Sequence, residues 1–137
     1  MRQTEIAQYI LANACYLHQF RGDTKRVKEL AKATTDFVAD KDLILWHDIA
    51  EFFMCWVTCV DETTMENAKR LCDALELWAE DEIETPYFKA IAGEACVCAE
   101  LVNRGVDLIN QAEDLMRHTG VLWYYDELQN IRKRQGF

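Results

Sequence analysis

The residues of this chain best suited to chemistry are six cysteines and three histidines, which together could supply ligands for a zinc ion. Cys55 and Cys59 are four positions apart, and Cys96 and Cys98 are two apart. Structural zinc sites usually take paired ligands of the form Cys-x-x-Cys from a tight turn. These cysteines instead lie inside apolar, helix-forming stretches. We therefore predict no metal site and no disulfide, with the thiols packed as small apolar groups in a reducing compartment.

The histidines do not form a catalytic set with other residues. His18 comes just before a turn, where we expect a core histidine hydrogen-bonded to a backbone carbonyl, not a general base. His47 and His118 flank helix ends and have no obvious carboxylate and nucleophile companions. The sequence has no glycine-rich phosphate loop, serine nucleophile elbow or aspartate-rich metal loop. We therefore expect that the protein is not an enzyme and uses no cofactor.

The segments that carry these residues have helical periodicity. The first predicted helix covers residues 3–20, places Ile10 and Leu17 on its apolar stripe, and ends at Gly22. Asp23 or Thr24 can cap the second helix, which ends at the polar residues 40–42. The third helix, residues 43–60, is apolar around nearly its whole circumference, so we expect it to be the most buried.

Capping and breaking residues divide the second half of the chain into four more helices. Thr63 and Glu66 form a capping box that opens the fourth helix, which the acidic run 80–82 ends. Thr85-Pro86 has the chemistry of a helix start, predicting a fifth helix over about 86–102. The turn is expected at Asn103-Arg104-Gly105. The sixth helix then closes at Gly120, and the seventh covers about 121–134.

Composition bounds the fold class and the partners. With 137 residues, half of them apolar, the chain is predicted to form a single domain, 1–137. One proline and few glycines favour an all-α fold. The net charge of -9 argues against nucleic-acid binding, and the cations 132–134 are interpreted as favourable charges at a helix C-terminus. Because no leader or membrane anchor is visible, we expect a soluble, cytoplasmic protein.

An internal repeat with a period near 40 residues runs through the chain. A small residue in the second helix of each pair is followed thirteen positions later by an aromatic residue: Ala33 and Trp46, Ala74 and Tyr87, and Ala112 and Tyr125. This pattern predicts an α-α superhelix of three helical hairpins plus a terminal helix, about seven helices in all. The predicted ranges are 3–40, 43–80 and 85–119 for the hairpins and 121–134 for the terminal helix.

The sequence resembles a known family over about residues 8–134. The matching elements are Leu17-His18-Gln19-Phe20-Arg21-Gly22-Asp23, Trp56-Val57, Leu77-Trp78, Pro86-Tyr87-Phe88 and residues 119–128. They are similar to the C-terminal tetratricopeptide-like (TPR-like) region of bacterial multidomain signalling proteins. These include predicted ATPases linked to adenylate cyclase domains and large ATP-dependent transcriptional regulators. The resemblance implies a protein-protein interaction scaffold in signal transduction or transcription regulation, with catalysis located in other domains.

In this architecture the first helix of each hairpin lines a concave face. Positions next to the packing stripe are expected to point into it: Tyr9, Tyr16, Gln19, Asp48, Glu51, Thr58, Val97 and Glu100. Because these positions are acidic with interleaved aromatic residues, we predict a basic or amphipathic protein or peptide partner. The alternative reading is that they are solvated polar positions without a binding role.

Two other functions stay open from the sequence. The apolar third helix and the unpaired seventh helix could bury against a second copy, giving a homodimer. Alternatively, the helices could enclose a small apolar effector, making the chain a small-molecule sensing domain of such a regulator. We expect a non-catalytic interaction module, with the effector-sensing domain as the alternative, and no contact with nucleic acid or membrane.

Overall fold

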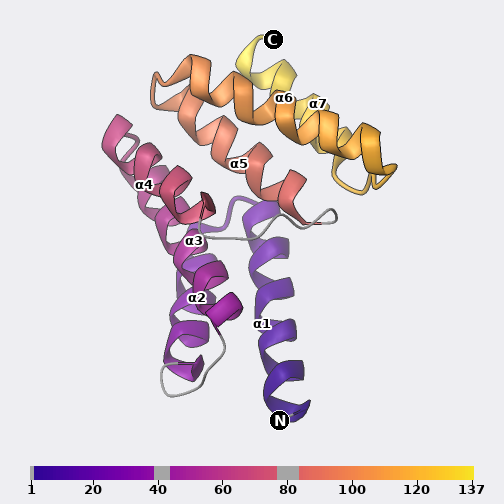
Figure 1. Ribbon diagram of the computed structural model, residues 1–137. Coiled ribbons are helices and arrows are strands. Elements are labelled where there is room, and N and C mark those ends of the chain that lie inside the picture. The colour runs from indigo at the N-terminus through magenta and orange to yellow at the C-terminus, as the bar shows by residue number, and fades with distance from the viewer. Residues whose placement is uncertain (1, 39–43, 77–83) are drawn as a thin grey trace. The chain divides into compact units, whose positions relative to one another are not determined.

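The computed structural model describes the backbone of residues 2–38, 44–76 and 84–137, and the side chains of 10–11, 13–37, 47–76 and 84–137. These residues form seven α-helices and no strand (Figure 1), which confirms the all-α class and the predicted number of helices. The helices are α1 (Arg2–Phe20), α2 (Thr24–Val38), α3 (Ile44–Asp61), α4 (Met65–Glu76), α5 (Thr85–Cys98), α6 (Val102–Thr119) and α7 (Tyr125–Gln135). No described helix combines the length and apolar character needed to cross a bilayer.

The chain divides into two compact units, Met1–Asp61 and Glu62–Phe137, and each is described by itself. In the first unit α2 packs against α1 and α3, and α1 also contacts α3. In the second unit α5 contacts α4, α6 and α7. The antiparallel pairs α1–α2 and α5–α6 are consistent with the helical hairpins of a superhelix (Figure 1). The pairing of α3 with α4 and the single domain 1–137 stay predictions.

The core of the first unit centres on α3. Phe52 and Phe53 are fully buried, and Val27 and Ala31 of α2 are also fully buried. The first predicted stripe is wrong in part, since Ile10 is 61% exposed and Leu17 is 58% exposed. Because α1 carries apolar residues on more than one side, periodicity alone did not identify the face that α2 and α3 cover.

Turn chemistry fixes both ends of the connection between α1 and α2. Gly22 has φ 70° and lies where the sequence predicted the turn. The backbone amides of Gly22 and Asp23 donate to the carbonyls of Gln19 and His18, the pattern of a Schellman motif. Asp23 then caps α2, because its Oδ1 accepts a hydrogen bond of 3.1 Å from the amide of Arg26.

The turn between α5 and α6 lies earlier than the sequence predicted. Helix α5 ends at Cys98 and not near 102, and α6 begins at Val102, so Asn103-Arg104-Gly105 belongs to a helix. The amides of Glu100 and Leu101 donate to the carbonyls of Val97 and Cys96, which is again a Schellman motif. Glu100 occupies its left-handed position with φ 68°, where glycine is usual.

The α5–α6 pair explains why Gly105 lies inside a helix. A Cβ placed on Gly105 would lie 2.6 Å from the carbonyl oxygen of Gly93 and 2.5 Å from Cγ2 of Val97. A Cβ on Gly93 would lie 2.7 Å from Cγ1 of Ile109. The two glycines therefore permit a close helix crossing. Gly105 was predicted from the sequence as a turn residue, but its role is to allow this packing.

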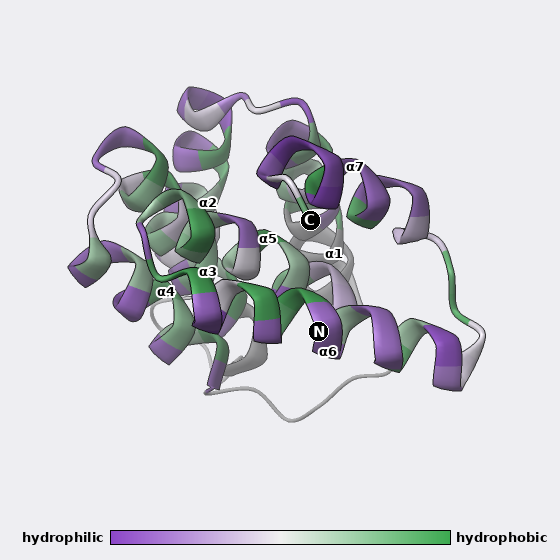
Figure 2. Ribbon diagram, turned by 90° about the horizontal axis from the view of Figure 1, so that it is seen from above, coloured by the Kyte–Doolittle hydropathy of each residue, from purple (hydrophilic) through white to green (hydrophobic). Residues whose placement is uncertain are grey.

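The last connection also differs from its prediction. Gly120 has φ 73° and ends α6 as predicted, but α7 begins at Tyr125 and not at 121. Tyr124 is only 3% exposed, so it is the buried aromatic of this repeat where Tyr125 was predicted. Figure 2 shows α7 as largely hydrophilic; Leu128 and Ile131 are its fully buried apolar residues. Helix α7 packs on α5 and α6, and its burial against a second copy stays a prediction.

The capping and repeat markers need smaller corrections. The cap of α4 that shows a hydrogen bond is Thr64, whose Oγ1 accepts from the amide of Asn67 at 3.1 Å, and the capping box was predicted one residue earlier. Ala33 is exposed, while Ala31 is fully buried, so the small buried residue of the first hairpin lies two positions earlier than predicted. The side chain of Trp46 is outside the described residues.

Replacing Gly105 with alanine tests the close crossing. We expect Gly105→Ala to lower the free energy of unfolding by about 1–2 kcal/mol, because overpacking outweighs the gain in helix propensity. Urea unfolding followed by circular dichroism measures the change. Asn103→Ala, at an exposed position in the same helix, is the control and should change stability by less than about 0.5 kcal/mol. An unchanged or raised stability of Gly105→Ala would contradict the crossing.

Replacing Glu100 with glycine tests the left-handed turn. A non-glycine residue at φ 68° is strained, so Glu100→Gly should raise the free energy of unfolding by about 1 kcal/mol. The matched control is Glu76→Gly at the end of α4, which should lower stability. Thermal and urea unfolding of both variants decide the result, and a destabilised Glu100→Gly would mean that the turn has another conformation.

Candidate interaction surfaces

The predicted concave-face residues of the first unit lie on α1 and α3. Tyr16 is half-buried, and its ring centroid lies 5.6 Å from that of Phe53, so it joins α1 to α3. Gln19 is half-buried, and Tyr9 lies in α1 with its side chain outside the described residues. The contact between α1 and α3 therefore places predicted concave-face residues from two helices in the same unit.

The predicted residues of α3 lie on one face of that helix. Asp48 is half-buried, whereas Glu51 and Thr58 are exposed. Oε1 of Glu51 accepts a hydrogen bond of 3.7 Å from the thiol of Cys55, and the hydroxyl of Thr58 donates to the carbonyl of Met54 at 3.0 Å. The face thus offers one exposed carboxylate and one partly covered carboxylate to a ligand.

Helix α1 also carries an exposed apolar ridge. We call Ile10, Leu17 and Phe20 the α1 ridge; their exposures are 61%, 58% and 58%. Their spacing of seven and three residues places them along one side of a helix with 3.6 residues per turn, next to the side of Tyr16. Sequence reasoning missed this ridge because it assigned Ile10 and Leu17 to the core.

The two predicted residues of the second unit have different environments. Val97 is half-buried and faces Gly105 of α6, so its side chain contributes to the close helix crossing. Glu100 is exposed in the strained turn after α5. Both residues lie near the C-terminal end of α5, in the second unit.

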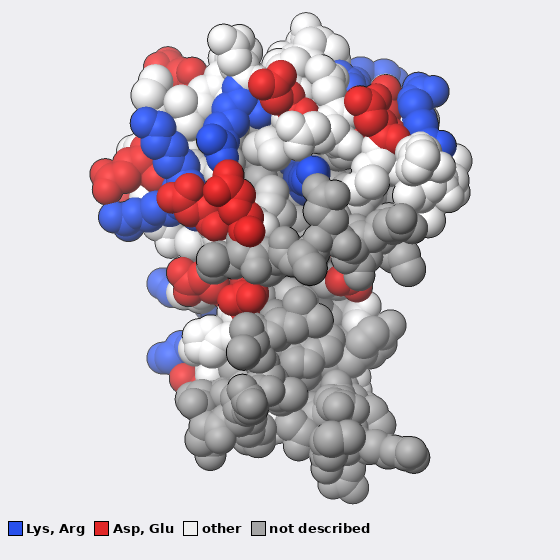
Figure 3. Space-filling model, in the orientation of Figure 1, with Lys and Arg blue, Asp and Glu red and all other residues white. Residues whose placement is uncertain are grey.

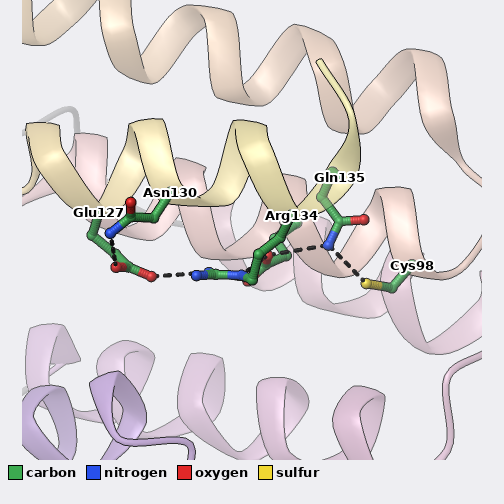
Figure 4. Close-up of polar contacts among 6 residues, drawn as sticks. Cys98, Glu127, Asn130, Arg134 and Gln135 are labelled. Carbon is green, nitrogen blue, oxygen red and sulfur yellow. Dashed lines mark hydrogen bonds and ion pairs between the residues drawn. The ribbon is translucent and has the colours of Figure 1, made fainter.

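Helix α7 is held on α5 by a charged network that the sequence did not reveal. The guanidinium of Arg134 donates to both carboxylate oxygens of Glu94 at 3.2 Å and to Glu127 at 2.9 Å. The amide of Gln135 donates to Glu94 and to the sulfur of Cys98, and Asn130 donates to Glu127 (Figure 4). Hydrogen bonding to Glu94 raises the pKa of Arg134 further.

A second charged pair ties α7 to α6. Arg132 donates to Glu113 at 3.3 Å and to Asn110 at 2.8 Å. Burial by itself raises the pKa of Glu113, but the hydrogen bond from Gln129 and the charges of Arg132 and Arg117 make the net shift downward. The cations at 132 and 134 therefore have defined carboxylate partners. On the face shown in Figure 3, described Lys and Arg side chains lie among Asp and Glu side chains.

Aromatic residues form a third feature, in the connection between α6 and α7. Leu122 and Trp123 are 53% and 52% exposed, whereas Tyr87 of α5 is 1% exposed. The ring of Tyr87 lies 5.6 Å from that of Trp123 and 5.0 Å from that of Tyr124. The connection is thus anchored by Tyr124 and leaves part of an indole ring accessible to a partner.

An open depression lies between α5 and α6. Its volume is about 440 Å³, and its lining residues are Lys89, Gln111, Asp114, Leu115 and His118. Lys89 donates to Gln111 across it at 3.2 Å. The depression is open to solvent over most of its surface, and its charged lining would suit a polar ligand better than the apolar effector considered from the sequence.

The residues with catalytic or metal-binding potential are dispersed in the described part of the chain. No three described His, Cys, Asp or Glu side chains gather as a metal site. Nδ1 of His18 lies 3.8 Å from Oδ2 of Asp23 and has no hydrogen-bond partner, so the predicted bond to a carbonyl is not made by that atom. All six cysteines are free thiols.

Removing the Arg134 side chain tests how α7 is held. The network is partly exposed, so Arg134→Ala should lower local stability by about 1 kcal/mol and speed amide hydrogen exchange in α7 about fivefold. Lys133→Ala is the matched control, because Lys133 is exposed on the same turn. Exchange followed by mass spectrometry measures both variants, and equal rates in the two would rule out a specific role for Arg134.

Comparison with known proteins found no matching family model, no matching curated protein and no matching solved structure.

Proposed function

We propose that this chain is a non-catalytic protein-protein interaction module that binds a basic, amphipathic segment of another protein. The observation that carries the proposal is the α1 ridge, in which three large apolar side chains on one helix side are more than half exposed. Single exposed apolar residues are ordinary, but an aligned group of them is typical of a binding surface. An amphipathic helix could cover this ridge with its own apolar face.

Charge supports the same partner class. The chain carries a net charge of -9, and Asp48 and Glu51 lie on α3, which packs beside α1. Apolar contacts along the ridge would supply most of the binding energy, while carboxylates would favour lysine or arginine on the partner and speed its association. An acidic partner would be repelled.

The strained turn at Glu100 supports a second contact region. Left-handed backbone at a non-glycine residue is costly and is enriched at functional sites. Glu100 is exposed there with φ 68°, and it was a predicted partner-binding residue. We propose that Glu100 contributes less to binding than the α1 ridge, because its predicted neighbour in the site, Val97, packs against α6.

The resemblance to TPR-like regions supplies the proposed setting. We propose that the module serves a bacterial signalling or transcription-regulatory protein in the cytoplasm, where it would recruit or restrain a partner while other domains carry out catalysis. The helical hairpins of each unit support this assignment at the level of architecture only. A polar effector in the depression near Lys89 is the second candidate.

A labelled 18-residue helix of leucine and lysine, amphipathic by design, is the probe for the binding test. We expect Leu17→Ser and Phe20→Ser each to weaken its affinity about tenfold, since exposed anchors typically contribute more than about 1 kcal/mol. Glu51→Lys should weaken binding a few-fold, with a larger effect at low salt. Fluorescence anisotropy measures each dissociation constant.

Matched controls distinguish specific binding at the α1 ridge from nonspecific binding of the probe. Val102→Ser removes an apolar side chain that is 49% exposed on α6, and Asp36→Lys reverses an exposed charge on α2. Neither should alter the affinity, and a probe with glutamate in place of lysine should bind weakly. The proposal fails if Val102→Ser weakens binding as much as Leu17→Ser.

Sedimentation velocity and native mass spectrometry of the unliganded chain complete the test. A dimer abolished by Leu17→Ser would assign the ridge to self-association and contradict the proposed partner. A bound mass of a few hundred daltons, lost on Lys89→Ala, would favour the effector-sensing function. A monomer without added mass is the expected result.

A further inference from the structure

Two buried cysteines from different helices meet in the second unit. The sulfur of Cys72 on α4 lies 3.3 Å from the sulfur of Cys96 on α5. Their exposures are 1% and 0%, and both are free thiols. They are 24 residues apart in the sequence, so the contact is created by the packing of α4 on α5.

A cation lies beside this pair. Arg104 of α6 donates to Glu76, the last residue of α4, at 3.1 Å, and its positive charge favours the thiolate of Cys72. The side chains of Arg104 and Glu76 are 46% and 69% exposed. Cys72 itself is 1% exposed, so a small oxidant must reach its sulfur through local motion of the surrounding side chains.

The electrostatic surroundings favour the thiolate of Cys72. The hydrogen bond from Cys96, together with Arg104, lowers the pKa of Cys72 to about 7, against the opposing effects of burial and Asp73. Burial instead raises the pKa of Cys15 to about 12, and burial with Glu94 raises that of Cys98. Because thiolates are the reactive form of cysteine, Cys72 is poised to react where Cys15 and Cys98 are not.

We propose that Cys72 and Cys96 form a redox modification site that a hydroperoxide converts reversibly into a disulfide between α4 and α5. This inference does not depend on the proposed partner-binding function. The sulfurs must approach by only about 1.3 Å to reach the bond length of a disulfide, which is a small movement for two side chains.

The reaction balances with hydrogen peroxide as the oxidant. The thiolate sulfur of Cys72 attacks one peroxide oxygen, the O–O bond breaks, and hydroxide leaves, giving a sulfenic acid on Cys72. The sulfur of Cys96 then attacks the Cys72 sulfur and displaces hydroxide, which takes the Cys96 proton and leaves as water. The hydroxide of the first step takes up the proton that Cys72 released on ionising, so the two sulfurs lose two electrons in total and the peroxide is reduced to two waters. A thiol reductant reverses the change.

Arg104 acts as a positioning residue in this scheme, because it stabilises the attacking thiolate without entering the bond changes. Its loss should therefore slow the reaction and leave the product the same. The paired geometry of Cys72 and Cys96 determines which disulfide forms.

The test uses the full chain, reduced, desalted and treated with equimolar hydrogen peroxide under native conditions. Intact mass spectrometry should show a loss of about 2 Da, and peptide mapping without reductant should find Cys72 joined to Cys96. Dithiothreitol should restore the original mass. Arg104→Gln should form the same disulfide about fivefold more slowly.

Controls distinguish specific oxidation of the Cys72–Cys96 pair from nonspecific oxidation of thiols. Cys98→Ser should leave the rate and product unchanged, and Cys72→Ser should abolish the crosslink; the mapping of the unmodified chain stands even if Cys72→Ser folds poorly. The proposal is overturned if the native chain forms no Cys72–Cys96 bond. It is also overturned if that bond forms only in urea, or no more often than pairs such as Cys55–Cys59.

Discussion

The close crossing of α5 and α6 is the contact on which the second unit depends. Gly93 and Gly105 bring the two backbones so near that a Cβ on either would overlap atoms of the other helix. Helix α5 is then free to use its other sides against α4 and α7. The sulfur pair on the α4 side and the Glu94 network on the α7 side both follow from this central position of α5.

The first unit is organised differently, by large side chains. Phe52 and Phe53 fill its core, and Tyr16 reaches across to Phe53 from α1. Because α1 is packed on one side by α2 and α3, the described apolar side chains Ile10, Leu17 and Phe20 on another side stay exposed. The stability of this unit and its proposed binding surface thus come from opposite sides of the same helix.

Local chemistry predicted the features that depend on neighbouring residues. Gly22 and Gly120 end helices as expected, and Asp23 caps α2, because each acts through adjacent backbone. Features that depend on distant residues were missed. Gly105 looks like a turn residue until Gly93 is placed beside it, and Arg134 gives no local sign of Glu94, which lies 40 residues away.

The same difference between local and long-range features applies to the candidate site. Helical spacing gave Tyr16, Glu51 and Thr58 positions near the surface of their unit, but it assigned Ile10 and Leu17 to the core. An apolar residue on an amphipathic helix is buried only if a neighbouring helix covers it, and the sequence of α1 does not say which side is covered. The pairing of Cys72 with Cys96 likewise required the packing of α4 on α5.

Helix α7 has the chemistry proposed for the partner, with Leu128 and Ile131 on its buried side and Arg132 and Arg134 bound by carboxylates. It is tethered to α6 by a connection of a few residues, which gives it an effective concentration on α5 and α6 on the order of millimolar. A separate segment of similar affinity, present at micromolar concentration, would lose that competition. The acidic groups Glu94 and Glu113 are therefore reserved for the chain itself, and a partner in trans must find its contacts elsewhere.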